Sequence, residues 1–332
     1  MSDGLLDRYD ALLFDLDGTV YRGGQALPAA AEVVDRAHAA GVAVRFVTNN
    51  ASRAPETVAE HLRGMAVRAD AAEVSTSAQA AAAVLRGRLA PGDHVLVLGT
   101  DALADEVTAV GLTPVRGFSA DVKGVCQGLS PKMTWEDLAE GALAIRAGAF
   151  WVACNVDRTL PTDRGLLPGN GSLVHALRVA TDQEPEVAGK PATPLMDQSI
   201  RSAGAARPLV VGDRLDTDIE GAVSAGVDSL LVLTGVATAA DLLAAGPHER
   251  PTYVAADLTA FDRPADELAI RARPGWAVAV DGGRATITGD GDPLDLLRTL
   301  CAACWAAGDD ARALHPDPAA AAALTTLGFR IG

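Results

Sequence analysis

The sequence predicts an α/β protein with a doubly wound parallel sheet, and three apolar runs are the main observation behind this fold class. Residues 11–14, 42–47 and 208–213 have the length and composition of strands that are buried on both faces. Helix signals follow each run. Because alternating strands and helices form right-handed crossovers, we expect ligands to collect at the carboxyl ends of these strands.

The first half of the predicted core contains two strands and two helices. The strand at 11–14 ends in the loop Asp-Leu-Asp-Gly-Thr, and an Ala-rich helix is expected over 28–41, with proline at its start and glycine at its end. The second strand, 42–47, ends in the polar residues 48–52. These residues can cap a helix over about 55–65.

The second half of the core returns much later in the chain. A strand at 208–213 is followed by a helix over 216–225, which Gly226 stops, and by another strand at 229–233. The strand-helix-strand order matches that of the first half, so both halves are expected to contribute to one sheet.

Two further parts are expected outside this core. The long intervening segment carries strand signals at 95–98 and 149–153 and a capping box at 134–137, which indicate an inserted α/β cap domain. Near the end, strands at 276–280 and 285–288 resemble a hairpin, and an apolar helix follows in a small α+β module. The predicted division is a core of residues 1–78 and 186–262, a cap of residues 79–185 and a C-terminal module of residues 265–332.

The composition favours a small-molecule partner. The 332 residues carry a formal net charge of −15, and no basic stripe is present to bind nucleic acid or an anionic membrane surface. The sequence shows neither a signal peptide nor an apolar run long enough to span a bilayer, so we expect a cytoplasmic protein. The four cysteines are expected to be buried thiols, although Cys301 and Cys304 form a Cys-x-x-Cys pair. A homo-oligomer is also considered.

Two aspartates after the first strand are the leading catalytic candidates. Asp15 and Asp17 are two residues apart, so their side chains leave an extended chain on the same side. A hard cation would offset their repulsion, and Mg²⁺ could take the Asp15 carboxylate, a backbone carbonyl near Asp17 and the carboxylate of Asp213. Asp218 is expected to support this site through a metal-bound water or Lys190.

A second group of polar residues is expected to hold a phosphate. Thr48 offers a hydroxyl at a strand end, and the amides of Asn49 and Asn50 precede a helix whose dipole favours an anion. Lys190 supplies a positive charge. On this interpretation Asp15 attacks phosphorus to form an acyl phosphate, while Asp17 protonates the leaving alcohol and then activates water.

Four motifs in this order resemble those of the haloacid dehalogenase (HAD) phosphatases. They are Asp-Leu-Asp-Gly-Thr-Val at 15–20, Thr-Asn-Asn at 48–50, Lys-Pro at 190–191 and Gly-Asp-Arg-Leu-Asp-Thr-Asp-Ile at 212–219. The resemblance covers residues 10–257 and is strongest to the branch with a large cap, which includes 4-nitrophenyl phosphate, phosphoglycolate and pyridoxal phosphate phosphatases. It implies a magnesium-dependent phosphoric monoester hydrolase with an aspartyl-phosphate on Asp15.

The resemblance also suggests a substrate. The C-terminal module is similar to the truncated, acetyltransferase-like module of actinobacterial family members that hydrolyse glycerol 3-phosphate to glycerol and phosphate in glycerophospholipid metabolism. Phosphoglycolate and other small organophosphates are the alternatives. In the cap, Asn155 and Asp157 resemble the family's substrate-facing segment, although Val156 stands where relatives commonly have proline and both polar residues could equally form a turn.

One alternative belongs to a different functional class. Signalling receiver domains also combine a phosphoaccepting aspartate with Mg²⁺, threonine and lysine on a doubly wound sheet. A receiver needs neither an acid-base carboxylate at Asp17 nor a large cap that excludes water, so we expect an enzyme. The C-terminal module could regulate or dimerise it.

Overall fold

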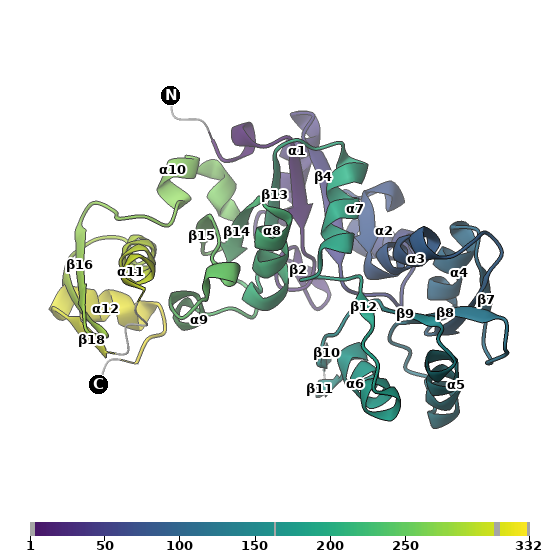
Figure 1. The fold of residues 1–332 in the computed structure, drawn as a ribbon. Coiled ribbons are helices and arrows are strands. Elements are labelled where there is room, and N and C mark those ends of the chain that lie inside the picture. Colours follow the sequence, from purple (N-terminus) through teal and green to yellow (C-terminus); the bar gives the residue numbers. More distant parts are fainter. Residues whose placement is uncertain (1–3, 163, 309–312, 331–332) are drawn as a thin grey trace. The chain divides into compact units, whose positions relative to one another are not determined.

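The structure is a computed structural model that describes residues 4–162, 164–308 and 313–330 (Figure 1). The chain divides into two compact units. The first comprises Met1–Val44 and Ala205–Gly332, and the second comprises Arg45–Gly204. Mixed helices and parallel strands confirm the predicted α/β fold class. The finer division into core, cap and C-terminal module stays a prediction.

The first unit contains four parallel strands in the order β15-β14-β13-β1. All residues of β1 and β13 are buried, which explains why their sequences are continuous apolar runs. The strands and helices of this unit include predicted elements and further short ones that the sequence did not indicate. Their bounds are β1 Ala11–Phe14, β2 Tyr21–Arg22, β3 Gln25–Ala26, α1 Ala30–Ala39, β13 Pro208–Gly212, α8 Glu220–Ala225, β14 Asp228–Val232, α9 Ala239–Leu243, β15 Tyr253–Ala255 and α10 Ala265–Leu268.

Short helical turns connect several of these elements. Among the residues that the structure describes, four are 3-10 turns. The turn directly after β13 is a wider π-helical one, in which the amide of Ile219 donates to the carbonyl of Arg214 over 3.2 Å. Such wide turns are rare and often lie at functional sites. The turns are η1 Leu6–Arg8, the π-helical η3 Leu215–Ile219, η4 Pro247–Glu249 and η5 Leu258–Asp262 in the first unit, and η2 Ala71–Glu73 in the second.

The second unit contains two groups of parallel strands. β4 pairs with β5, and a separate five-stranded sheet has the order β12-β9-β8-β6-β7. A short antiparallel hairpin, β10-β11, completes the unit. The bounds are β4 Ala43–Thr48, α2 Pro55–Gly64, β5 Val74–Thr76, α3 Ser77–Arg88, β6 His94–Leu98, α4 Asp101–Ala109, β7 Thr113–Val115, β8 Val122–Gln127, α5 Trp135–Arg146, β9 Phe150–Ala153, β10 Thr159–Thr162, β11 Gly165–Pro168, α6 Asn170–Thr181, β12 Glu186–Val187 and α7 Thr193–Ala203.

The strands and the capped helix predicted for this inserted segment are present. β6 includes the predicted run at 95–98, and β9 begins one residue after the start of the predicted run at 149–153. At the start of α5, the Thr134 hydroxyl accepts a hydrogen bond from the amide of Asp137 over 3.2 Å, and the Asp137 carboxylate accepts one from the amide of Thr134 over 2.8 Å. This reciprocal pair is the capping box that the sequence indicates.

The C-terminal residues of the first unit fold as a three-stranded sheet with two helices. The predicted hairpin is confirmed, because β16 (Trp276–Asp281) pairs antiparallel with β17 (Arg284–Gly289), and β18 (Ala313–Pro316) pairs parallel with β17. The remaining elements are α11 (Pro293–Ala307) and α12 (Pro318–Thr326). In α11, Asp292 caps the start, proline occupies the first turn and Gly308 ends the helix with a φ of 65°.

This C-terminal sheet shares a hydrophobic core with the strands of the first unit. Leu231 and Val254 of β14 and β15 belong to the same buried cluster as Leu296 and Leu300 of α11. Cys301 and Cys304 lie in that cluster as free, buried thiols, as predicted. Cys126 and Cys154 in the second unit are also free and buried. No helix in the described part of the chain is long and apolar enough to cross a membrane.

A buried arginine adds polar contacts between α11 and neighbouring segments. Arg298 is 0% exposed, and its guanidinium donates to the carbonyl oxygens of Val254 (2.7 Å) and Leu268 (3.3 Å) and to the Asp295 carboxylate (2.7 Å). One side chain therefore satisfies acceptors on β15, α10 and α11. A buried charge is tolerated only where its donors are satisfied in this way.

Replacing this arginine should destabilise the first unit. We expect Arg298→Ala to lower the free energy of unfolding by about 2–5 kcal/mol, because it leaves buried acceptors without donors. Urea denaturation, followed by far-UV circular dichroism, measures the change. The matched control is Arg284→Ala, since Arg284 is exposed on β17. Equal unfolding midpoints for the two variants would contradict the anchoring role of Arg298.

Candidate active site

Three aspartates of the first unit converge where β1 and β13 end. Asp15 follows β1 directly, and its amide donates to the carbonyl of Val211 on β13 over 2.8 Å. Asp213 follows β13, and Asp218 lies in the π-helical turn after it. One carboxylate oxygen from each aspartate lies within 4.8 Å of the others, and Asp213 and Asp218 are 0% and 1% exposed.

Three glycines leave room for these carboxylates. A Cβ on Gly18 would lie 2.5 Å from Oδ2 of Asp213, and a Cβ on Gly235 would collide with the same carboxylate. A Cβ on Gly212 would collide with the side chain of Asp218. The space that these glycines provide is therefore filled by carboxylate groups, which fixes where the oxygens can lie.

Hydrogen bonds hold two of the carboxylates in place. Oδ2 of Asp213 accepts from the amide of Val236 over 2.7 Å, and its Oδ1 accepts from the hydroxyl of Thr19 over 3.4 Å. Oδ2 of Asp218 accepts from the amide of Arg214 over 3.1 Å. Carboxylates oriented by such contacts are typical of metal-binding and catalytic sites.

The donor set fits a hard divalent cation. Three carboxylates this close repel one another, and oxygen ligands of this kind are those that Mg²⁺ prefers. Asp15, Asp213 and Asp218 would hold the ion. The sequence pattern placed Asp218 in a supporting position, whereas the geometry makes it available as a ligand as well.

Asp17 lies in the tight turn after β1, outside the carboxylate cluster. The amide of Gly18 donates to the carbonyl of Tyr21 over 2.7 Å, and Gly18 has a φ of 94°, which favours glycine. Asp17 is exposed, yet partial desolvation of its carboxyl group raises its pKa, while the positive charge of Arg22 acts in the opposite direction. A raised pKa favours the protonated form that a general acid needs.

The other predicted site residues belong to the second unit, and Asn49 connects most of them. Its Nδ2 donates to the carbonyl of Lys190 (3.0 Å) and to the Asp157 carboxylate (3.3 Å), and its Oδ1 accepts from the amide of Lys190 (2.8 Å). Nδ2 of Asn155 donates to the carbonyl of Asn49 over 2.7 Å. The structure therefore brings these four residues together within their own unit.

Lys190 and Thr48 lie at the same end of β4. Lys190 is only 3% exposed, and its Nζ donates to the carbonyl of Val47 over 2.9 Å. The Thr48 hydroxyl accepts from the amide of Asn50 over 3.1 Å, so that amide, a predicted phosphate donor, already has a partner. The Asn50 carboxamide oxygen accepts from the amide and hydroxyl of Ser52 over 2.8 and 2.7 Å.

Several residues that support these groups were not identified from the sequence. Ser77 donates its hydroxyl to the carbonyl of Asn49 over 2.6 Å, and the buried Asn170 donates to the carbonyl of Asn155 over 2.8 Å. Thr19 and Gly235 contact Asp213 in the first unit. Thr19 lies within the motif at 15–20, although no role was assigned to it, whereas Gly235 lies in a separate loop without a local signal.

Family models match both halves of the predicted core and the C-terminal end. Residues 12–113 match a haloacid dehalogenase-like hydrolase model, and residues 187–261 match a HAD-hydrolase-like model. Residues 273–329 match a GCN5-related N-acetyltransferase like domain. D-glycerol 3-phosphate phosphatase of Mycobacterium tuberculosis is 50% identical over 325 residues, which are 95% of this chain and 90% of that protein. The chain belongs to the haloacid dehalogenase-like hydrolases.

Solved structures of this family show the same fold. A glycerol phosphate phosphatase from Mycobacterium tuberculosis, in complex with magnesium, has a TM-score of 0.93 and 48% identity, with 99% of this chain and 100% of that chain covered. The match to a double mutant of a thermostable NPPase from Geobacillus stearothermophilus covers 76% of this chain and 97% of that chain, with a TM-score of 0.69 and 32% identity. A 5'-nucleotidase of Bacillus subtilis is 38% identical over 76% of this chain and 96% of its own.

These relationships confirm the resemblance to HAD phosphatases, including the large-cap branch. The prediction that the chain is an enzyme, a phosphoric monoester hydrolase, is confirmed by the family and by a relative that spans most of the chain. The prediction of Mg²⁺ as cofactor is confirmed as well, since the family, a magnesium-bound relative and the carboxylate cluster agree.

The close approach of Gly235 to Asp213 predicts that a larger residue at position 235 weakens cation binding. We expect Gly235→Ala to weaken Mg²⁺ binding by about tenfold or more, because the added Cβ displaces the Asp213 carboxylate. Isothermal titration of the metal-free protein with Mg²⁺ measures this. The control is Gly87→Ala, since a Cβ on Gly87 meets nothing within 4 Å. Unchanged affinity in Gly235→Ala would show that Asp213 does not determine the site.

Proposed function

We propose that the chain is a Mg²⁺-dependent phosphatase of a small phosphomonoester, with D-glycerol 3-phosphate as its main substrate. The observation that carries this proposal is the cluster of Asp15, Asp213 and Asp218. The cluster lies where two strands end, and three glycines leave room for its carboxylates. The match to the D-glycerol 3-phosphate phosphatase, which spans 95% of this chain, supports D-glycerol 3-phosphate as the substrate. Phosphoglycolate and other small organophosphates are the alternatives.

The first chemical step would begin at Asp15. The Asp15 carboxylate attacks phosphorus and forms an acyl phosphate, while the bond from phosphorus to the substrate oxygen breaks. A bound Mg²⁺ supplies positive charge to the phosphoryl oxygens and reduces the repulsion between anion and carboxylates. The backbone contacts of Asp213 and Asp218 keep the neighbouring carboxylates fixed during this change.

Asp17 would move the protons in both steps. In its protonated form, which the raised pKa favours, it gives a proton to the leaving alkoxide. The resulting carboxylate then accepts a proton from the water that attacks the acyl phosphate. Phosphate leaves, and both aspartates return to their starting states.

The polar residues of the second unit are proposed to bind substrate. Lys190 would neutralise the phosphoryl group, and its burial increases the strength of such a charge. Thr48 and the amides of Asn49 and Asn50 would contact phosphate oxygens, and the Asn50 amide would exchange its hydrogen bond to the Thr48 hydroxyl for one to phosphate. Asn155 and Asp157 would contact the rest of the substrate. Cytoplasmic location and a homo-oligomeric state stay predictions.

The assigned nucleophile predicts a selective loss of turnover. We expect Asp15→Asn to reduce phosphate release by at least about 10³-fold, since the carboxamide cannot act as the nucleophile. The assay compares D-glycerol 3-phosphate with phosphoglycolate, each with Mg²⁺ and with chelator. Asp35→Asn is the control, because Asp35 is an exposed carboxylate on α1 and should leave turnover unchanged.

Two outcomes would overturn parts of the proposal. Faster turnover of phosphoglycolate than of D-glycerol 3-phosphate would reassign the substrate. A native chain that turns over neither ester, but takes phosphate from acetyl phosphate and retains it on Asp15, would instead support the signalling alternative.

The role of Asp17 predicts a burst with a good leaving group. With 4-nitrophenyl phosphate, Asp17→Asn should release one equivalent of nitrophenolate rapidly, because this leaving group needs no proton. Turnover should then slow by about 10²–10⁴-fold, since no base activates water. Stopped-flow absorbance separates the two phases. Equal loss of both phases would contradict the assigned role.

A further inference from the structure

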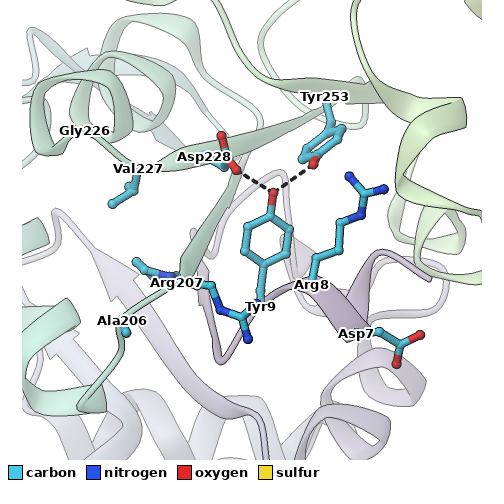
Figure 2. A pocket seen from close by; sticks show the side chains of 10 residues that line it. Asp7, Arg8, Tyr9, Ala206, Arg207, Gly226, Val227, Asp228 and Tyr253 are labelled. Atoms are coloured by element: carbon cyan, nitrogen blue, oxygen red, sulfur yellow. Dashed lines mark hydrogen bonds between the residues drawn. The ribbon is translucent and has the colours of Figure 1, made fainter. Parts of the chain in front are cut away.

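A pocket in the first unit lies at the opposite end of the strands from the carboxylate cluster. It has a volume of about 460 Å³, and it is lined by residues just before β1 and by residues just before or at the start of β13 and β14, together with Tyr253, the first residue of β15 (Figure 2). Ligand pockets usually span about 300–1,000 Å³. In open α/β sheets the reacting ligand binds at the carboxyl ends, so this pocket is separate from the proposed catalytic site.

Two tyrosines form an ordered polar wall in this pocket. Tyr9 and Tyr253 are only 7% and 4% exposed. The Tyr9 hydroxyl donates to Oδ2 of Asp228 over 2.8 Å and lies 2.9 Å from the hydroxyl of Tyr253, as Figure 2 shows. Burial raises the pKa of Tyr9, so its hydroxyl stays protonated and remains a donor. The network therefore fixes the position of the Asp228 carboxylate.

Asp228 retains capacity to bind a ligand. Its Oδ1 accepts from the hydroxyl of Thr252 over 2.9 Å, and its Oδ2 accepts from Tyr9. A carboxylate has about four acceptor positions, so further donors can be accommodated. The residue is exposed, which leaves those positions accessible to a hydroxyl group of a small molecule.

Arg207 supplies a cation in the same pocket. Its backbone is held by Asp10, whose carboxylate oxygens accept from the amides of Arg207 (2.8 Å) and Ala206 (2.9 Å). Among the described residues, its guanidinium has no hydrogen bond or ion pair. By contrast, the guanidinium of Arg8, which also lines the pocket, is paired with Asp266 over 3.1 Å. Arg207 can therefore bind an anion without breaking an existing interaction.

We propose that this pocket is a second ligand site that binds a small hydroxylated organic anion. The anionic group would pair with Arg207, and a hydroxyl of the ligand would donate to Asp228. The net charge of the chain is −15, and this pocket contains both a free guanidinium and an ordered carboxylate. Phosphate and carboxylate have the same recognition chemistry here, because a guanidinium binds both in a bidentate way.

Calorimetry with two probes tests this proposal. 3,4-Dihydroxybutylphosphonate, which the enzyme cannot hydrolyse, and D-glycerate are each titrated into the native full-length chain with chelator, so that no cation assists the catalytic site. We expect saturable binding of one molecule per chain for at least one probe. The tighter probe indicates whether phosphate or carboxylate is preferred.

Matched variants and a matched ligand locate the binding. Arg207→Gln should weaken it by about tenfold or more, while Arg201→Gln, which changes an exposed arginine on α7, should have no effect. Butylphosphonate lacks both hydroxyls and should bind about tenfold more weakly than its dihydroxy counterpart. No saturable binding of either probe at millimolar concentration, or equal affinity in Arg207→Gln, would overturn the proposal. Because Arg207 has no role in the proposed catalysis, these results are independent of turnover.

Discussion

Electrostatic repulsion among Asp15, Asp213 and Asp218 is the constraint on which the proposed chemistry depends. Three carboxylates within 4.8 Å would separate in water, yet two strand ends and several backbone donors keep them together. The free energy that their repulsion costs must come from the packing of fully buried strands around them. A divalent cation removes much of this cost when it binds. The repulsion that the fold maintains therefore increases the affinity of the site for a cation, which also attracts phosphate.

Both ends of the same sheet matter in this interpretation. The strand β13 connects Arg207, just before it, with Asp213, just after it, over five buried residues. The rigid apolar strand serves as a scaffold for polar groups at either end, because polar side chains are excluded from its buried centre. Through α11, the C-terminal sheet packs into a buried cluster with Leu231 of β14 and Val254 of β15. In this unit, segments that are distant in sequence therefore share one hydrophobic cluster.

The sequence was sufficient to predict the elements whose signals are local. The buried strands, the capping box of α5, the hairpin of β16 and β17 and the aspartates at strand ends each follow from a few neighbouring residues. Contacts between distant segments were not predictable in this way. Gly235 restricts Asp213 from another loop, and Arg298 reaches carbonyls on two other elements. Such contacts depend on how packed elements meet, which no periodicity in one segment encodes.

Asn49 illustrates a related limit. Its position before α2 suggested that its backbone amide binds phosphate. Nothing in the sequence indicated what its side chain does, which is to make hydrogen bonds to both the backbone amide and the carbonyl of Lys190. A carboxamide can bind a peptide group through a donor and an acceptor at once, which neither an aspartate nor a serine can do in the same geometry. The residue type is therefore explained by a contact about 140 positions away in the chain rather than by its local motif.

The π-helical turn after β13 affects how related sequences should be aligned. In this turn the amides of Asp218 and Ile219 both donate to the carbonyl of Arg214, so the residue that widens the turn comes after Asp218. Loss of that residue would return the chain to a regular helix and leave Asp218 in its place. A one-residue gap at this point between two homologues would then preserve the arrangement of charges instead of disrupting it.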